Sequence, residues 1–190
     1  MALKATIYKA KLQIADMDRG LYVDHAVTLA RHPSETDERM MVRLVALALW
    51  RPADDHQGML EMAGSVSDTD EPDLWQKDLT GRILHWIDVG QPDDKRILKA
   101  CGRAERVTVV AYAAGAGIWW QGVAGKLVRA RSLAVWRWPA AACAELATLA
   151  QRTMQLQVTV QDGTVWVGDG ERSVELQPQA LLGGADGALR

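Results

Sequence analysis

Two aspartates near the middle of the chain have the chemistry of a metal site. Asp73 follows a proline in "EPDLWQ", and Asp88 lies inside the apolar run "RILHWIDV". An unpaired charge in a buried strand is costly, so such an acid has a partner, a metal or a catalytic role. Two carboxylates at adjacent strand ends repel each other unless they share a proton or a divalent cation.

A hard divalent cation fits this pair of acids. We expect Mg²⁺, with Mn²⁺ as the alternative, because such ions take oxygen ligands and keep waters that can attack a phosphodiester. A third acid would come from the preceding helix, where Glu35, Asp37 and Glu38 are the candidates. In helical geometry Asp37 aligns with the apolar stripe and Glu38 lies on its flank. The simpler interpretation is that Asp37 caps the helix and Glu38 is solvated.

The elements that position these acids can be read from hydrophobic periodicity. Alternation over residues 4–15 and in "LYVDHAVTLARH" predicts a β-hairpin. In "HPSETDERMMVRLVALALW" the period becomes helical, with a start at Pro33 and Ser34 and a capping-box-like S-x-x-D completed by Asp37. The polar stretch that follows is expected to be irregular, with one short strand around "MLEM".

The central third of the chain predicts an α/β arrangement. A strand over 82–89, a helix from near Pro92 and the β-branched strand "RVTVVAYA" form an alternation that implies a parallel pair. Along an extended strand Leu84, Trp86, Asp88 and Gly90 share one face.

The remaining third combines helices and strands. We expect a helical segment around Trp119 and Trp120, a strand near 133–138 and a helix opened by Pro139. The pair Asp162-Gly163 predicts a tight hairpin, "RSVELQ" can add a third strand, and residues 180–190 are expected to fray. The fold class is therefore α/β (α+β): a mixed central sheet flanked by helices, with an N-terminal hairpin and a C-terminal β-meander.

Composition narrows the class of protein. The 190 residues favour one domain over 1–190, and a net charge of −2 gives no global basic field to attract phosphate. Cys101 and Cys143 are interpreted as reduced core thiols without a zinc pattern. The chain shows neither a signal-peptide core nor an apolar run of membrane-spanning length, so we expect a cytoplasmic protein without a membrane partner. Phosphate-loop and dinucleotide-binding motifs are also missing from the sequence.

Several long strings resemble one known family. "HPSETDERMMVRLVALAL", "EPDLWQKDLTGRI", "WIDVGQPD" and "RILKACGRA", preceded by "IADMDRG", are similar to the YaeQ family of small bacterial proteins over most of the chain. The resemblance is weakest in residues 51–62 and in the tail.

The resemblance implies a fold related to the PD-(D/E)XK nucleases, in which an acidic helix and two acid-bearing strands surround a metal. Carried over, the acids are Glu38, Asp73 and Asp88, all three as metal ligands. The pattern departs at Gly90, which stands where those nucleases have a lysine; Gln91 beside it is the substitute polar group. Alternatively, Lys95 or Lys99 from the next helix supplies the missing charge.

Two functions follow as expectations. The first is a Mg²⁺-dependent nuclease or phosphodiesterase with Glu38, Asp73, Asp88 and Gln91 as site residues and an unknown substrate. The alternative is a catalytically degenerate binding protein on the same fold. It would act on nucleic acid or on a transcription-related protein, because the resemblance also implies a link to transcription elongation.

Overall fold

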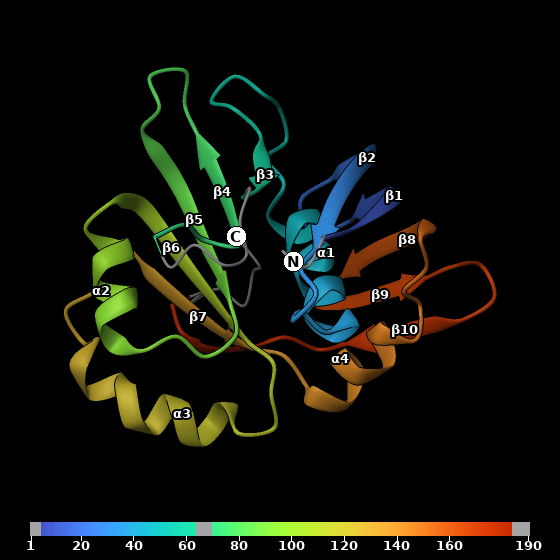
Figure 1. Ribbon diagram of the computed structural model, residues 1–190. Helices are drawn as coiled ribbons and strands as arrows, with labels where there is room; N and C mark the ends of the chain where they lie inside the picture. Colours follow the sequence, from blue (N-terminus) through green and yellow to red (C-terminus); the bar gives the residue numbers. More distant parts are fainter. Residues whose placement is uncertain (1–4, 64–69, 184–190) are drawn as a thin grey trace.

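Two β-sheets with a helix between them form the framework of the protein (Figure 1). The computed structural model describes residues 5–63 and 70–183. One sheet has five strands in the order β10-β9-β8-β1-β2. Its strands are β1 (Thr6–Asp16), β2 (Leu21–Arg31), β8 (Thr153–Gln161), β9 (Thr164–Gly168) and β10 (Ser173–Leu176).

The predicted hairpins are confirmed in this five-stranded sheet. β1 and β2 pair antiparallel, and so do β8 with β9 and β9 with β10. The turn between β8 and β9 has positive φ at both Asp162 (50°) and Gly163 (73°), as a two-residue turn matched to the strand twist requires. β1 also pairs with β8 in parallel, so the N-terminal hairpin and the C-terminal meander share one sheet.

The second sheet has six strands in the order β11-β7-β6-β5-β4-β3. β3, β4 and β5 are antiparallel neighbours, whereas β5, β6 and β7 run parallel, which confirms the predicted parallel pair. Its strands are β3 (Leu60–Met62), β4 (Leu74–Lys77), β5 (Ile83–Val89), β6 (Ala104–Ala111), β7 (Leu133–Arg137) and β11 (Gln179–Leu182).

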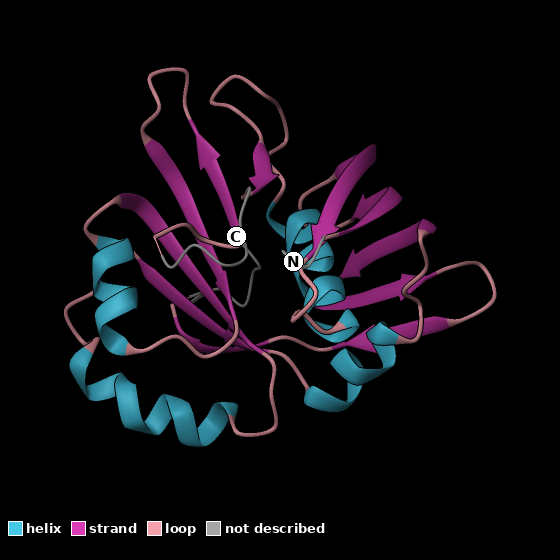
Figure 2. Ribbon diagram, in the orientation of Figure 1, coloured by secondary structure: helices cyan, strands magenta, loops and turns pink. Residues whose placement is uncertain are grey.

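Helices cover both faces of the six-stranded sheet (Figure 2). α2 and α3 pack on one face, where Ile97 and Val123 join strand residues in a separate apolar cluster, and α1 lies on the other face. Among the described residues, no helix is long and apolar enough to span a membrane. The helices are α1 (Asp37–Trp50), α2 (Asp94–Cys101), α3 (Ala116–Val123), a 3-10 turn (Ala124–Lys126) and α4 (Ala140–Ala147).

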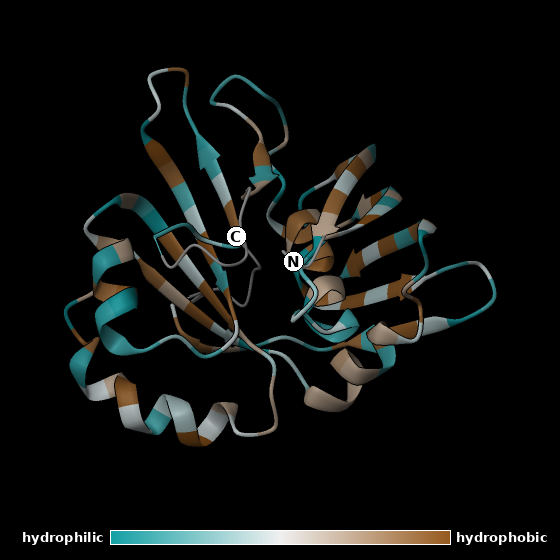
Figure 3. Ribbon diagram, viewed as in Figure 1, coloured by the Kyte–Doolittle hydropathy of each residue, from teal (hydrophilic) through white to brown (hydrophobic). Residues whose placement is uncertain are grey.

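The core is built around α1. Every residue from Met40 to Trp50 is buried, since the helix has a sheet on either side, and a helix that is apolar all round has to be enclosed (Figure 3). At its end Trp50 stacks on Trp138, with ring centroids 6.2 Å apart. The one charged residue in this stretch is Arg43, whose side chain is as buried as its neighbours.

The expected fold class, α/β (α+β) with a mixed sheet flanked by helices, is confirmed, and the N-terminal hairpin and C-terminal meander together form the other, five-stranded sheet. The structure corrects two details of the sequence-based expectations. α1 begins at Asp37 rather than near Pro33, because the cap is the Thr36 hydroxyl, which accepts from the Arg39 N–H at 3.1 Å; Ser34 instead contacts His32. β11 occupies the first residues of the stretch expected to fray, while 184–190 lie outside the described residues.

Candidate functional site

Asp73 lies immediately before β4 and extends the hydrogen bonding of the sheet with its side chain. Its N–H donates to the Ile87 carbonyl at 3.0 Å, and its Oδ2 accepts from the Val89 N–H at 2.7 Å. The carboxylate thus takes the place of a ladder carbonyl one step beyond the regular strand. Pro72 just before it favours the extended backbone that this arrangement needs.

Asp88 lies on the neighbouring strand β5, next to the residue that Asp73 contacts. The antiparallel register ends with Leu74 paired to Ile87, and the Asp73 N–H also donates to the Ile87 carbonyl, so Asp73 and Asp88 both adjoin this last pair. Only 7% of Asp73 and 2% of Asp88 are exposed. We call these two residues the acidic pair.

Each carboxylate of the acidic pair is held by an arginine from a different helix. Arg96 on α2 forms a bidentate salt bridge with Asp88, in which Nε donates to Oδ2 at 3.0 Å and Nη2 donates to Oδ1 at 2.8 Å. Asp93 caps α2 by accepting from the Arg96 N–H at 2.7 Å, which fixes the position of the Arg96 backbone from which the side chain extends to Asp88. On the other side, Arg39 of α1 donates to Asp73 Oδ1 at 2.5 Å.

Glu35 extends this ion-pair chain into the interior. Its buried carboxylate accepts from Arg39 at 3.0 Å and from Arg43 at 2.8 and 3.0 Å, and the Nε of Arg43 lies 3.6 Å from Asp73. Glu35, Arg43, Arg39 and Asp73 therefore alternate in charge. Such alternation compensates charges that would be costly to bury alone.

Burial and neighbouring charges oppose each other at the acidic pair. Burial raises the pKa of Asp73, and the nearby Asp88 adds to that effect, while Arg39, the Val89 N–H and Arg43 act against it. The pKa of Arg39 is raised because Asp73 and Glu35 together outweigh the effect of its own burial. The Asp73 carboxyl is therefore easier to protonate than an aspartate in water.

The other predicted site residues take different places. Glu38 is half-buried and lies toward Tyr112 and Cys143. Burial raises the pKa of both groups, and the Glu38 charge adds to that effect. Asp37 pairs with Arg31 at 3.4 Å instead of facing the site. Of the three helix acids it is Glu35 that shares arginines with Asp73, and across residues 5–63 and 70–183 no three acidic, histidine or cysteine side chains gather as a metal-binding group.

The position of the missing lysine is occupied by backbone alone. Gly90 has φ +119°, and its N–H donates to the Val110 carbonyl at 2.8 Å, so the chain continues the parallel ladder before turning away. Gln91 is exposed and points toward Gly115, since its Nε2 lies 3.9 Å from where a Cβ of that glycine would stand. Lys99 pairs with Asp70 at the surface, and Lys95 is exposed.

Sequence reasoning missed the arginines as the immediate partners of the acids. Arg96 is expected from the sequence to be solvated or to contact phosphate, and Arg39 carries no signal of its own. Arg43 does carry one, because a charged residue within a run of apolar helix positions has to find a buried partner. That argument applied to the helix would have indicated a buried acid such as Glu35.

The acidic pair has donor chemistry that suits Mg²⁺. Proteins bind this ion through one or two carboxylates and let it keep several waters. Each oxygen of Asp73 and Asp88 accepts one hydrogen bond, from Arg39, Val89 or Arg96. Because a carboxylate has about four acceptor positions, each side chain retains capacity for a further ligand.

Comparison with known proteins places the chain. Residues 1–178 match the YaeQ protein family. The chain belongs to the YaeQ family. It is 45% identical to the YaeQ protein of Salmonella typhi over 178 residues, which cover 93% of this chain and 96% of the relative. The YaeQ protein of Escherichia coli is 43% identical over 177 residues, covering 93% and 95%.

Solved YaeQ structures share the fold. The crystal structure of YaeQ from Xanthomonas axonopodis pv. citri is similar with a TM-score of 0.87 at 47% identity, covering 93% of this chain and 98% of that one. The structure from Pseudomonas syringae has the same TM-score at 39% identity, covering 94% and 97%. The family resemblance read from the sequence is therefore confirmed for this YaeQ chain.

Proposed function

We propose that this protein is a Mg²⁺-dependent phosphodiesterase of nuclease type, with Asp73 and Asp88 as the metal-holding residues. The observation that carries the proposal is that two buried carboxylates adjoin the last paired residues of β4 and β5. Mn²⁺ has the same oxygen preference and is the alternative ion. The substrate class is a phosphodiester, without a more specific identity.

The order of elements supports the same proposal. α1, β3, β4, β5, α2 and β6 follow one another as a helix, an antiparallel three-stranded meander, a crossover helix and a parallel strand. This is the arrangement of acid-bearing helix and strands that the resemblance to PD-(D/E)XK nucleases implies. Glu38 stays outside the acidic pair in this proposal, and Glu35 acts by positioning Arg39.

The arginines suit a phosphodiester as well as a carboxylate. About a quarter of the Arg39 and Arg96 side chains is exposed, so both guanidinium groups border the solvent while their partners are buried. A bidentate guanidinium binds phosphate oxygens with the same geometry as a carboxylate. Either arginine can therefore exchange part of its carboxylate contact for a phosphate that enters beside it.

The bound ion and the neighbouring side chains would have different roles in phosphodiester hydrolysis. When bound, Mg²⁺ would lower the pKa of a coordinated water for attack on phosphorus and balance the charge of the phosphate. Arg39 and Arg96 would orient the phosphoryl oxygens. Gln91, which carries no charge, would hydrogen-bond a water or leaving group where a lysine is otherwise expected.

The test combines ion binding with cleavage. Titration calorimetry with MgCl₂ or MnCl₂ is expected to show one site in the natural protein and a loss of at least tenfold in affinity in Asp73→Asn and Asp88→Asn. Cleavage of labelled DNA or RNA in Mg²⁺ is expected to disappear in the same variants. Asp37→Asn is the matched control, because this acid at the start of α1 lies outside the acidic pair and contacts Arg31. Equal ion binding in all four proteins would refute the proposal.

A second function is favoured by the substitution at Gly90 and by the arginines that neutralise the acids. A catalytically degenerate protein on this fold would bind nucleic acid or a transcription-related protein without cleaving it. In the same experiment, binding without ion dependence and without cleavage in the natural protein would establish this second function in place of the first. Cleavage lost on Asp88→Asn would exclude it.

A further inference from the structure

The five-stranded sheet has a polar face directed away from α1. β1 sends Tyr8, Ala10, Leu12 and Ile14 into the core, so its alternate residues face outward. The pairing register arranges these outward residues in rows across β2, β1 and β8: Thr28–Lys9–Thr153, Ala26–Lys11–Gln155, Asp24–Gln13–Gln157 and Tyr22–Ala15–Thr159. We call this surface the outer face.

Aromatic rings stand at both ends of the last row. Thr159 is paired with Trp166 on β9, so Tyr22 and Trp166 are three strand spacings, about 14 Å, apart with the small Ala15 and Thr159 between them. Tyr22 is 67% exposed, and Trp166 is half-buried. Their planar rings are therefore available to a ligand that lies on the sheet.

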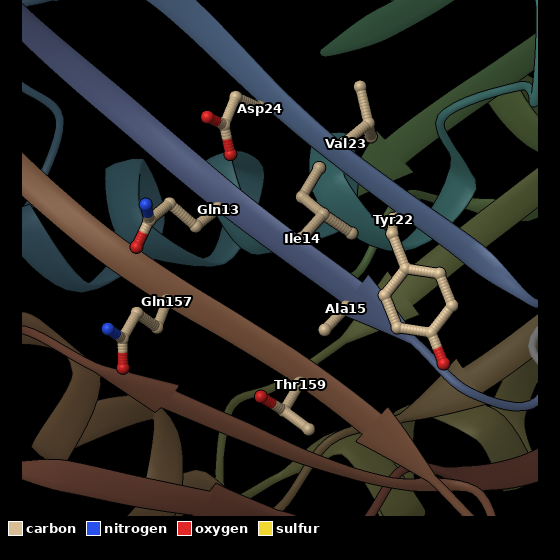
Figure 4. A pocket seen from close by; sticks show the side chains of 8 residues that line it. All are labelled: Gln13, Ile14, Ala15, Tyr22, Val23, Asp24, Gln157 and Thr159. Atoms are coloured by element: carbon tan, nitrogen blue, oxygen red, sulfur yellow. The ribbon is translucent and has the colours of Figure 1, made fainter.

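The outer face is hollowed next to this row. Figure 4 shows Gln13, Asp24, Gln157 and Thr159 around a hollow of about 700 Å³, with Tyr22 at its end. A second hollow of about 320 Å³ shares Gln13 and Asp24 and extends to Lys11 and Gln155.

The polar side chains around the hollows face solvent and are available to a ligand. Within the part of the chain that the structure describes, four of these side chains form no hydrogen bond to another protein group: Gln13, Gln155, Gln157 and Thr159. Each amide offers a donor and an acceptor. This set matches the edges of nucleobases, and Asp24 adds an acceptor for their amino groups.

Cations gather at the opposite end of the outer face. Lys9 and Lys11 are exposed on the central strand between neutral neighbours. No ion pair within residues 5–63 and 70–183 involves either lysine. Arg152, just before β8, contacts the Tyr8 ring at 5.3 Å and therefore lies on the core-facing side of the sheet. The negative charges of the face, Asp24 and Glu175, lie toward the aromatic row. The face is therefore polar along its length, with free positive charge at one end.

We propose that the outer face binds single-stranded nucleic acid. The phosphates would lie along Lys9 and Lys11, while bases stack on Tyr22 and Trp166 and meet the glutamine amides between. From Lys9 to Ala15 the strand extends about 20 Å, room for roughly four nucleotides. A duplex is disfavoured because its bases are stacked on one another and cannot stack on Tyr22 and Trp166. An acidic peptide is disfavoured because it would contact the lysines but neither the aromatic rings nor the glutamine amides. The proposal does not rest on the acidic pair, which belongs to the other sheet.

Fluorescence anisotropy with a labelled 12-nucleotide RNA and the matching DNA tests the proposal. Lys9→Ala/Lys11→Ala is expected to weaken binding at least tenfold and to reduce the slope of log K against log salt by about 1.4, because two phosphate contacts are lost. Tyr22→Ala is expected to weaken binding about fivefold or more, and Tyr22→Phe to restore it. All these positions are exposed, so folding is retained, which circular dichroism checks.

Controls separate this site from general charge and from the acidic pair. Arg129→Ala/Arg131→Ala removes two exposed cations from the loop before β7 and is expected to leave affinity unchanged. Asp88→Asn is expected to retain binding even where cleavage is lost, so the two proposals fail independently. Affinity that is absent at low salt, insensitive to both outer-face variants, or stronger for the duplex or for a poly-glutamate peptide would overturn the proposal.

Discussion

Charge inside the protein is concentrated on a few residues that depend on one another. Glu35 and Arg43 are 5% and 2% exposed, and each is satisfied mainly by the other. Removing one partner of a buried ion pair leaves the other charge uncompensated, whereas removing both can be nearly neutral. The pair is therefore a necessity once either charge is present, rather than a large source of stability.

Arg43→Leu is expected to lower the free energy of unfolding by about 3–5 kcal/mol, because Glu35 then keeps only Arg39. The double variant Glu35→Leu/Arg43→Leu is expected to recover most of that loss. Urea denaturation measures both. Arg82→Leu is the control, since its exposed pair with Glu105 contributes at most about 1 kcal/mol. A double variant no more stable than Arg43→Leu would contradict this account.

His85 gives the molecule a defined sensitivity to acid. It is a fully buried residue of β5, with Nε2 2.8 Å from the hydroxyl of Thr108 on β6 and Nδ1 3.1 Å from an Arg106 nitrogen. Burial, with help from the Arg106 charge, lowers its pKa to about 3 from the ordinary 6.5. Between these values the unfolded chain binds a proton that the folded one does not, so stability is lost as pH falls from 6.5 toward 3.

Replacing His85 with Gln is expected to remove about 1.4 kcal/mol per pH unit from the slope of unfolding free energy between pH 6 and 4. The glutamine amide of this variant can still form a hydrogen bond with Thr108, so the difference between the two proteins reports the loss of proton binding at this position. Urea denaturation at half-unit pH steps provides the measurement. The exposed His56 is the control, and His56→Gln is expected to keep the natural slope. An unchanged slope in His85→Gln would show that this histidine does not couple folding to acid.

At this scale the sequence indicates which acids are unusual but not what pairs with them. Asp88 is conspicuous because it interrupts an apolar strand, and its neighbour Asp73 follows from the meander. Arg39 meets Asp73 from 34 positions away and Arg96 meets Asp88 from eight, distances that only the tertiary fold sets. Hydrophobic periodicity indicates which side of a helix or strand faces solvent, but it does not identify the residues that form ion pairs across the fold.

Single elements in this protein are fixed by local contacts as much as by propensity. The turn into β3 passes so close to β4 that a Cβ on Gly58 would lie 2.0 Å from the Lys77 carbonyl oxygen. Gly58 also has φ +80°. The Gln76 side chain donates to the Gly58 carbonyl at 2.9 Å, which holds the crossing together.

Gly58→Ala is expected to destabilise the protein by more than about 2 kcal/mol, since a backbone clash adds to the cost of a left-handed conformation. Gly81→Ala separates the two causes. Gly81 has φ +87° in the β4–β5 turn with nothing within 4 Å of a built Cβ, so only the conformational cost of about 1 kcal/mol applies. Thermal or urea unfolding compares them. Equal losses would mean that the close approach at Gly58 relaxes freely.

The elements themselves were mostly predictable, for identifiable reasons. Asp162-Gly163 between alternating runs defines a hairpin within two residues, and α2 follows directly from its proline and apolar spacing. The start of α1 was displaced because Ser34 and Thr36 are equally good caps in sequence, and only the structure shows that Thr36 receives the Arg39 N–H. β4 has just four residues, too few for a clear period, and the resemblance rather than the alternation implied it.

The whole molecule is organised by α1, which supplies a core to both sheets. The parallel pairing of β1 with β8 joins segments more than 140 residues apart, and α4 and Trp138 close the same core from the C-terminal half. Alternation along a strand predicts one solvent-exposed face but does not identify the neighbouring strand, so the sequence predicts the hairpin and the meander without predicting that they pair with each other. The prediction of a single domain over 1–190 depends on whether the two sheets unfold together.

Replacing a large side chain at the centre of α1 by a smaller one tests whether the two sheets unfold together. Leu44 is fully buried in the cluster that includes residues of both sheets, so Leu44→Ala is expected to cost about 2–5 kcal/mol. Because α1 is shared, hydrogen exchange of β1 and β8 amides should accelerate to the same extent as that of β5 and β6. Ile118→Ala, at an exposed position on α3, is the control with an expected change within about 0.5 kcal/mol. Faster exchange confined to one sheet would show that the sheets are separately stable units and that the chain is not one cooperative domain.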